Sequence, residues 1–196
     1  MSAVTFGEAD AKAGLPFTVE ELDRLPDDGR RHELLDGVLV VSPRPTTLHQ
    51  FTAFQLGKLL DGACPDDLCV MLEPALQLTA TTTEFAPDIV VVPVNEVGVA
   101  KFTKPPLLVV EVRSPSTAII DLNRKKTAYQ RFGVPSYWIV DPDPAEPEVT
   151  VFELRDDRYV TVAITTAPFT VERPFPVTLN PAQLTRRLRP RDTEAS

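Results

Sequence analysis

The sequence has few of the residues that mark secreted, zinc-binding or membrane-spanning proteins. Only two of its 196 residues are cysteine and two are histidine, and their spacing does not match that of a zinc site. A disulfide between Cys64 and Cys69 is an alternative to buried thiols, but a reducing cytosol disfavours it. No apolar run approaches the roughly 20 residues of a membrane span. Because the N-terminus also lacks a basic segment followed by an apolar one, we expect a cytoplasmic protein.

The chain also lacks an excess of positive charge. It has 20 lysines and arginines against 28 acidic residues, a formal net charge of −8. A protein that coats nucleic acid in general should be basic, because neutralised phosphates supply most of its non-specific affinity. The composition excludes such a coat. A polyanionic substrate would need a local positive patch, and the acids could instead gather around a divalent cation.

The remaining composition is that of one soluble globular domain. Hydrophobic residues make up 43% and charged residues 24%, and the chain is long enough to bury a core without disulfides. The 20 prolines fall at element boundaries and no internal repeat is present. We expect a flexible N-terminus at 1–15, a single domain at 16–185 and a flexible basic tail at 186–196.

Short local signals predict most of the elements outside the centre of the chain. They are a capping box, a tight Asp-Gly turn between two strands, an apolar helical spacing, an Asp-Asp hairpin turn and an asparagine cap. In chain order these signals lie at Thr18 and Glu21, Asp36 and Gly37, Thr46 to Gly62, Asp156 and Asp157, and Asn180.

The centre of the chain predicts an α/β sheet. Aliphatic runs at 89–92 and 107–110 follow expected strand structure at 69–79, and such continuous runs suit strands buried on both faces. A helix is expected at 116–133, with Gly133 as its stop and Ser114, Ser116 and Thr117 as caps around Pro115. The next strand contains Tyr137 and Trp138, which we expect to pack between the sheet and a helix.

Two acidic residues interrupt the aliphatic runs. Asp88 opens one strand and Glu111 lies near the end of the other, and an ionised carboxylate in a core sheet costs several kcal/mol unless it is paired or binds a metal. Strand alternation puts Val109, Glu111 and Arg113 on one face. If the two strands are neighbours, the acids converge and suit Mg²⁺, which takes one or two carboxylates and several waters. The alternative is that Asp88 caps a turn and Glu111 forms an ion pair.

The helix that follows repeats charged residues at intervals of four. Asp121, Lys125 and Tyr129 share one helical face. An ordinary salt bridge between Asp121 and Lys125 explains two of them. In the functional alternative, Lys125 points at the carboxylate pair and orients or deprotonates a water, which an always-protonated arginine could not do.

Several segments together resemble the Uma-two family of restriction endonucleases, within the PD-(D/E)XK nuclease superfamily. The order is "APDIVVV", "LLVVEVRSPST" and "DLNRKKTAYQRFGVPSYWIVDP". The likeness extends to "RRHELLDGVLVVSPRPTTLHQ" and "PFPVTLNPAQL", so it covers roughly residues 17 to 185. It implies a restriction-endonuclease-like core, with a central mixed β-sheet flanked by helices and a metal site at one edge.

The resemblance implies roles for five residues in particular. Asp88 and Glu111 match the two metal-binding acids, and Glu33 in the "ELLDG" stretch would be a further acid near the metal. Arg113 stands where the superfamily usually has lysine, and it could stabilise a charged phosphorane. Lys125 occupies the place of a lysine displaced into the following helix, where it would position the attacking water.

Two further positions complete the expected site. The carbonyl of Val112 would join Asp88 and Glu111 as a metal ligand, together with a water. His49 stands where the family often has a histidine, and a capping or core-edge histidine is an equal alternative.

The implied function is an endonuclease that uses Mg²⁺ or Mn²⁺ to hydrolyse phosphodiester bonds of DNA. A homodimer is a further expectation, because two-fold symmetry suits a duplex. The alternative is a catalytically inactive nuclease fold that serves as a binding or regulatory module, which the acidic net charge and Arg113 favour. A metal-free acid/base hydrolase is disfavoured, because nothing separates the environments of the two carboxylates. The arginines after Thr185 could touch nucleic acid or simply be solvated.

Overall fold

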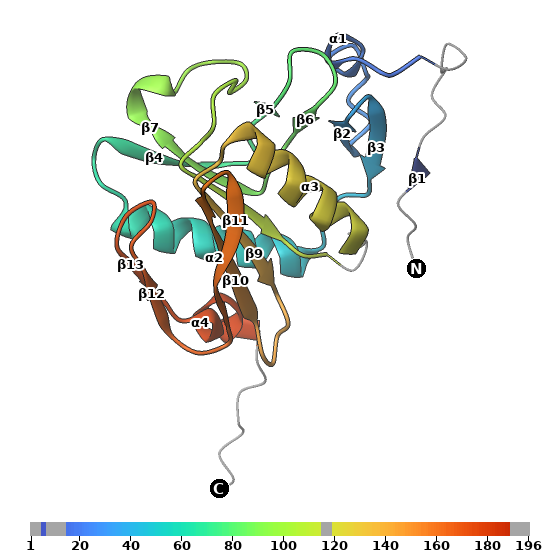
Figure 1. Cartoon of the computed structure of the whole chain (residues 1–196). Coiled ribbons are helices and arrows are strands. Elements are labelled where there is room, and N and C mark those ends of the chain that lie inside the picture. The colour runs from blue at the N-terminus through green and yellow to red at the C-terminus, as the bar shows by residue number, and fades with distance from the viewer. Residues whose placement is uncertain (1–4, 7–14, 115–118, 189–196) are drawn as a thin grey trace, which may run out of the picture.

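A six-stranded mixed sheet forms the centre of the molecule, with helices on both faces (Figure 1). The computed structural model describes residues 5–6, 15–114 and 119–188; the side chains of 5–6 and 119–121 lie outside this description. In spatial order the strands of this central sheet are β11 (Arg158–Thr165), β10 (Glu148–Arg155), β9 (Ser136–Asp141), β8 (Leu108–Val112), β7 (Ile89–Pro93) and β4 (Leu68–Leu72).

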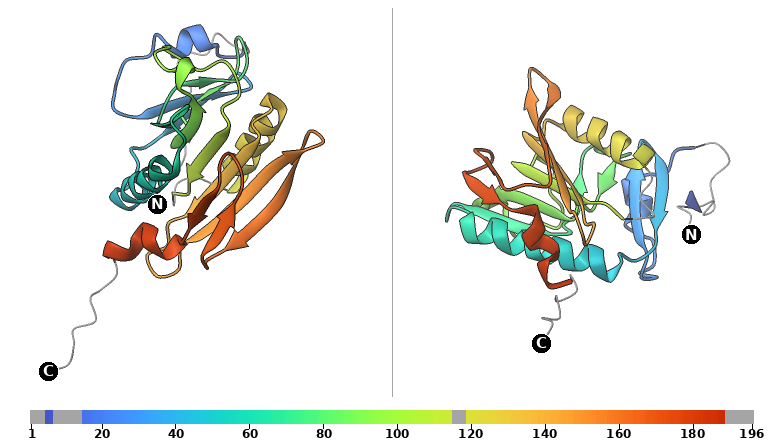
Figure 2. Two further views of the ribbon diagram at one scale, coloured as in Figure 1. Left: turned by 90° about the vertical axis from the view of Figure 1, so that its left-hand side faces the viewer. Right: turned by 90° about the horizontal axis from the view of Figure 1, so that it is seen from below.

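One parallel pair makes this sheet mixed. Strands β8 and β9 run parallel and are connected through α3 (Ile119–Phe132), whereas every other neighbouring pair is antiparallel. Figure 2 shows α3 on one side of the sheet and α2 (Thr47–Ala63) on the other. The predicted architecture, a central mixed sheet flanked by helices, is confirmed.

A second, smaller sheet lies beside α3. Its strands are β1 (Thr5–Phe6), β3 (Val38–Ser42), β2 (Arg31–Leu35), β6 (Glu84–Phe85) and β5 (Leu76–Gln77). Gly37, at φ +78°, makes the predicted turn between β2 and β3, and a β-carbon there would collide with Pro16. The strand segment predicted at 69–79 belongs to two strands in different sheets, because Glu73 adopts a φ of +49° and Pro74 follows it.

The central sheet has a hydrophobic core on each face. On one face the core includes Leu56 and Leu60 of α2 together with Val110 and Val112. On the other face Val109 packs with Tyr129 of α3 and with residues of the smaller sheet. Tyr137 and Trp138 are fully buried in these two cores, as expected. Alternate residues of β8 therefore face opposite layers, and Glu111 belongs to the face of α3.

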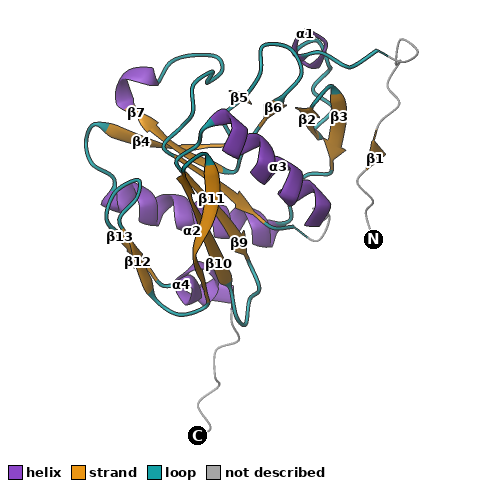
Figure 3. Ribbon diagram, in the orientation of Figure 1, coloured by secondary structure: helices purple, strands orange, loops and turns teal. Residues whose placement is uncertain are grey.

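The remaining helices, turns and strands lie outside the two sheets described above, and Figure 3 shows which elements are helices and which are strands. They are α1 (Val19–Leu22), the 3₁₀ turns η1 (Val94–Glu96) and η2 (Arg186–Leu188), the hairpin β12 (Phe169–Val171) and β13 (Val177–Leu179), and α4 (Pro181–Thr185).

The predicted local signals act as expected. Thr18 and Glu21 form the reciprocal capping box, and the side chain of Asn180 accepts a hydrogen bond from the backbone N–H of Ala182. Gly133 follows α3 at φ +89°, a left-handed conformation that glycine adopts without strain. Asp156 and Asp157 both have positive φ between β10 and β11. The predicted caps at Ser116 and Thr117 lie outside the described residues.

The structure differs from the predicted domain ends in two places. Thr5 and Phe6 pair with β3 inside the segment expected to be flexible at 1–15. Arg186–Leu188 continue α4 as a 3₁₀ turn, so regular structure reaches beyond the expected boundary at 185. The rest of the two expected flexible ends, 1–4, 7–14 and 189–196, lies outside the described residues. Within the described part of the chain, no helix has the length and apolarity of a membrane span.

The two sides of α2 provide a test of the core. Leu60→Ala is expected to lower the free energy of unfolding by about 2–5 kcal/mol, because the fully buried side chain leaves a cavity. Phe54→Ala, on the same helix but with the aromatic side chain 53% exposed, should cost less than about 1 kcal/mol. Urea denaturation measures both. Equal losses would contradict the placement of the core.

Candidate metal and phosphate site

The register of two strands brings Asp88 and Glu111 together. Strands β7 and β8 are antiparallel, with Ile89 opposite Val110. The residue before Ile89 and the residue after Val110 therefore lie side by side at one end of the pair. Asp88 and Glu111 are both buried there. The ion pair that was the alternative for Glu111 is also present, because Glu111 pairs with Lys125.

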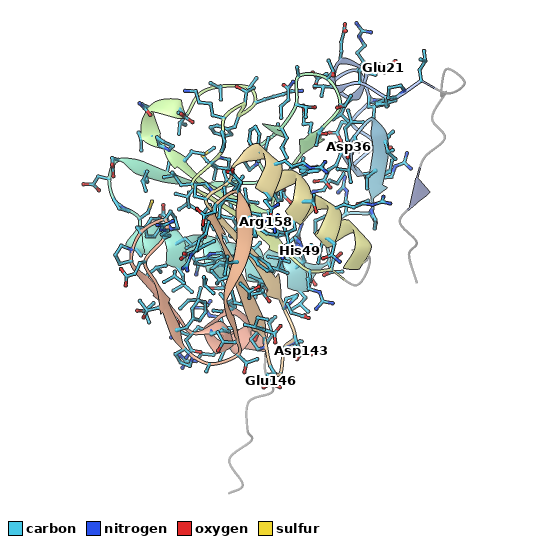
Figure 4. All side chains as sticks on the ribbon, in the orientation of Figure 1. Glu21, Asp36, His49, Asp143, Glu146 and Arg158 are labelled. Atoms are coloured by element: carbon cyan, nitrogen blue, oxygen red, sulfur yellow. The ribbon has the colours of Figure 1, made fainter. Side chains whose placement is uncertain are left out.

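Three donors surround the carboxylate of Asp88. Oδ2 accepts hydrogen bonds from the backbone N–H of Val112 at 2.7 Å and from Nε2 of His49 at 3.0 Å. Oδ1 accepts one from Nη2 of Arg31 at 3.0 Å. His49, labelled in Figure 4, extends from the first turn of α2 and is buried. His49 is therefore a hydrogen-bond partner of Asp88.

Lysine and tyrosine side chains of α3 reach Glu111. Nζ of Lys125 donates to Oε1 of Glu111 at 3.2 Å and to Oε1 of Glu33 at 2.8 Å. The hydroxyl of Tyr129 donates to the same oxygen of Glu111 at 2.7 Å. Glu33, on β2, also accepts a hydrogen bond from the backbone N–H of Ala86. Lys125 thus joins two buried acids from different sheets, whereas the side chain of Asp121, its predicted helical partner, lies outside the described residues.

The protonation of these groups follows from their burial and from each other's charge. Burial raises the pKa of Glu111 from its usual 4.5 to about 7, although the charge of Lys125 opposes the rise. Burial alone would lower the pKa of Lys125, but Glu111 and Glu33 outweigh it and hold the pKa above its usual range. Lys125 is therefore an ammonium group, which suits orienting a water or stabilising negative charge and does not suit proton abstraction.

Asp88 has the opposite balance. Burial acts to raise its pKa, but the hydrogen bond from His49, the charges of Arg31 and His49, and the N–H of Val112 outweigh burial. The pKa of Asp88 lies below its usual value, so its carboxylate is ionised. The site therefore holds two adjacent acids with separated pKa values, which the sequence did not predict.

These side chains line one small cavity. It has a volume of about 40 Å³ and is lined by Arg31, Glu33, Ser42, Pro43, Arg44, Pro45, Thr46, His49, Asp88, Glu111, Val112, Ser114 and Lys125. A cavity of this size holds one or a few water molecules or an ion, but no nucleotide. A larger substrate would have to bind at its mouth, where Arg44 is exposed.

One predicted site residue lies elsewhere. Nη1 of Arg113 donates to Oδ2 of Asp141 on β9 at 2.5 Å, and the side chain lines a separate cavity that includes Leu122 and Phe152. Arg113 lies on the same face of the sheet as Glu111, as strand alternation predicts, because its cavity includes Ile139 and Phe152, which pack on the side of α3. It lines a different cavity from Glu111, so a role of Arg113 in the site stays a prediction. Asp88, Glu111, Lys125, Glu33 and Val112 do line one cavity.

The sequence interpretation missed Arg31. Its guanidinium bridges Asp88 and the exposed Glu73, with Nη2 at 3.0 Å from an oxygen of each. Arg31 precedes Glu33 by two residues on β2, so strand alternation places both on one face. The two-residue spacing of Arg31 and Glu33 was therefore the signal in the sequence that could have placed Arg31 in the site.

The donor set fits a magnesium-type ion in its chemistry. Hard oxygen donors are what Mg²⁺ prefers, and it needs only one or two carboxylates because it keeps several waters. Oε2 of Glu111 and Oε2 of Glu33 accept no hydrogen bond from a described residue. Among the residues that the structure describes, no three Asp, Glu, His or Cys side chains are already gathered as a metal cage.

A mixed sheet between helices, with buried acids and a lysine meeting at the end of its central strands, defines a nuclease-like α/β protein. The chain belongs to the Uma2 (Uma-two) family, whose model is described as "Putative restriction endonuclease" and matches residues 19–185. A crystal structure from Anabaena variabilis ATCC 29413, described as a "putative nuclease belonging to DUF820", is similar with a TM-score of 0.72. The two are 20% identical over 89% of this chain and 100% of that chain. No curated protein matches the sequence.

The raised pKa of Glu111 predicts a pH-dependent cost to stability. Between about pH 4.5 and 7 the folded protein retains a proton that the unfolded chain has released, so stability falls as pH rises through this window. Glu111→Gln removes this titration, and its amide oxygen can still accept the hydrogen bond from Tyr129. The variant should lack the fall in unfolding free energy that the wild type shows as pH rises from about 4.5 to 7.

Urea denaturation at several pH values measures this difference. Glu146→Gln, at an exposed turn residue labelled in Figure 4, is the matched control and should follow the wild type throughout. Parallel curves for Glu111→Gln and the wild type across the window would contradict the assignment.

Proposed function

We propose that the protein is an endonuclease that uses Mg²⁺ or Mn²⁺ to hydrolyse phosphodiester bonds of DNA. The family and the fold support a nuclease. The observation that carries the finer proposal is that Asp88, Glu111 and Lys125, from three different elements, line the same cavity. Acidic oxygens beside an ammonium group are the donor set that metal-dependent phosphodiester hydrolysis needs.

Asp88 and Glu111 would hold the metal, with the carbonyl of Val112 and waters completing its coordination. When bound, the metal supplies a Lewis acid and a water of lowered pKa. Lys125 holds Glu111 and Glu33 in place and offers its ammonium group to a water or to phosphate oxygen. Glu33 acts as the additional acid, directly or through water. His49 and the N–H of Val112 fix the orientation of the Asp88 carboxylate.

The substrate backbone would lie across the mouth of the cavity. Arg44 is exposed there, its Nε donates to the carbonyl of Gly29 at 2.8 Å, and no described acid forms an ion pair with it. A guanidinium held by a backbone carbonyl and free of a carboxylate is suited to a phosphate. This local positive charge would allow a polyanion to bind at the mouth of the cavity although the net charge of the whole chain is −8. We place the activity in the cytoplasm and include a homodimer, which would match the symmetry of a duplex.

A binding module without turnover is the second candidate. The observation that favours it is that Arg31 and Lys125 already neutralise the acids through ion pairs. Calorimetry separates the two candidates. Binding of Mn²⁺ that is lost in Glu111→Ala supports the enzyme, and no binding at millimolar Mn²⁺ supports the module.

Loss of either the acid or the ammonium group should abolish nicking of DNA. With supercoiled plasmid and Mn²⁺, Asp88→Asn and Lys125→Met are each expected to lower the nicking rate at least about 100-fold, because each removes a charge next to the reacting phosphate. A chelator should stop the wild-type reaction. Glu146→Gln is the control and should retain the rate. Equal nicking by the wild type and both site variants would indicate a contaminant and contradict the proposal.

The proposed backbone contact of Arg44 has a distinct signature. Arg44→Gln should weaken binding to a short labelled duplex and reduce the slope of log affinity against log salt by about one, because one phosphate contact is lost. Fluorescence anisotropy in metal-free buffer, at several salt concentrations, measures both without cleavage. Arg155→Gln, on β10, removes the same charge away from the cavity and should leave the slope unchanged. An unchanged slope for Arg44→Gln would exclude the contact.

A further inference from the structure

Arg31 connects the buried acid of the site to its surface. The side chain of Asp88 is 1% exposed, that of Arg31 is 17% exposed and that of Glu73 is 57% exposed. A single nitrogen, Nη2, donates to both acids at 3.0 Å. The other guanidinium nitrogens donate no hydrogen bond to a described residue. Arg31 therefore has one buried partner, one surface partner and unused donors.

Arg31 also stands where a metal would have to act. Asp88 Oδ1 has Arg31 as its hydrogen-bond donor, while Oδ2 already has two donors. A divalent cation on Asp88 would meet the guanidinium charge and compete with it for the same oxygen. Arg31 stays protonated at any working pH, so the competition cannot end by loss of its charge. A cation can therefore bind Asp88 Oδ1 only if the guanidinium moves away from this oxygen.

Lys125, the other positively charged side chain that pairs with acids of the site, has no partner at the surface, among the residues that the structure describes, to which it could move. Lys125 is buried and its ion pairs are with Glu33 and Glu111, which are buried as well. Arg31 differs because one of its two carboxylate partners, Glu73, lies at the surface. The backbone N–H of Glu73 donates to the carbonyl of Asp88 at 3.2 Å, which keeps this alternative partner adjacent to the acid.

We propose that Arg31 exchanges with the metal and then binds the substrate phosphate. Without metal it pairs with both Asp88 and Glu73; when a divalent cation occupies Asp88, the guanidinium gives up Asp88, keeps Glu73 and moves toward the mouth of the cavity. There its unused donors, beside Arg44, bind a phosphate oxygen of the DNA backbone. Arg31 is thus a positioning residue that couples metal binding to phosphate binding, and by reciprocity each ligand favours the other. This inference rests on the proposed function.

The test is a calorimetric titration with Mn²⁺ alone, without DNA. Arg31→Gln should bind Mn²⁺ about tenfold more tightly than the wild type, because the competing charge is gone. Glu73→Gln should bind it more weakly, because the withdrawn guanidinium loses its surface partner. Arg155→Gln is the control of equal charge and should match the wild type. Opposite shifts from the two sides of one ion pair are not expected of residues that merely support the fold.

A second measurement separates charge from geometry. Arg31→Lys keeps the positive charge but not the planar fork, so its Mn²⁺ affinity should stay within about twofold of the wild type. At saturating Mn²⁺ both Arg31→Gln and Arg31→Lys should lower kcat/KM for plasmid nicking, although only the first binds metal more tightly. If Arg31→Gln does not fold, Arg31→Lys and Glu73→Gln still carry the test.

The outcomes distinguish this inference from the proposed function. If the wild type binds Mn²⁺ and nicks DNA while Arg31→Gln binds Mn²⁺ equally or more weakly, the exchange is wrong and the nuclease assignment stands. If Mn²⁺ is bound by neither protein and no nicking occurs, the proposed function itself fails and the exchange fails with it.

Discussion

The antiparallel pairing of β7 with β8 places two carboxylates side by side inside the protein, and the rest of the site compensates for that placement. Asp88 immediately precedes β7 and Glu111 lies in β8, and the aliphatic residues at 89–92 and 108–112 of these strands are buried. Two such acids cost several kcal/mol unless cations and hydrogen bonds oppose the loss of water. Arg31 from β2, His49 from α2 and Lys125 from α3 supply that compensation. The smaller sheet and both helices therefore converge on this one pair of strands.

The hydrogen bonds and ion pairs that offset burial differ between Asp88 and Glu111, and the pKa values of the two carboxyl groups therefore differ as well. Asp88 has hydrogen bonds to both of its oxygens and stays ionised, whereas Glu111 retains one oxygen without a described donor and has a pKa of about 7. A divalent cation would complete the charge balance of Glu111 and relieve its cost. A site of this kind reduces stability in exchange for ligand binding. The small volume of the cavity admits an ion and waters, so under the proposed function the DNA backbone would lie against the arginines at its mouth.

Lys125 and Arg113 show which features of the site the sequence predicted and which it did not. The pattern of the family assigned Lys125 on α3 as the replacement for the lysine that Arg113 displaces, and the structure does place Lys125 beside Glu111. The same reasoning put Arg113 on the face of Glu111 by strand alternation. Alternation did hold, because Arg113 lies on that face beside Asp141, but its side chain lines a cavity separate from that of Glu111. Periodicity therefore predicted the face of the residue and not the cavity that its side chain lines.

The sequence by itself determined the elements, their caps and turns, the mixed sheet between helices and the membership of Asp88, Glu111, Glu33 and Lys125 in one site, because these depend on local residue patterns and on a family likeness along the chain. Only the tertiary structure decided that Arg31 and His49 are the partners of Asp88, that residues 69–79 divide between two sheets, and that Glu111 and Asp88 differ in pKa. Those outcomes depend on distances between segments far apart in sequence and on burial, and neither is written in the order of the residues.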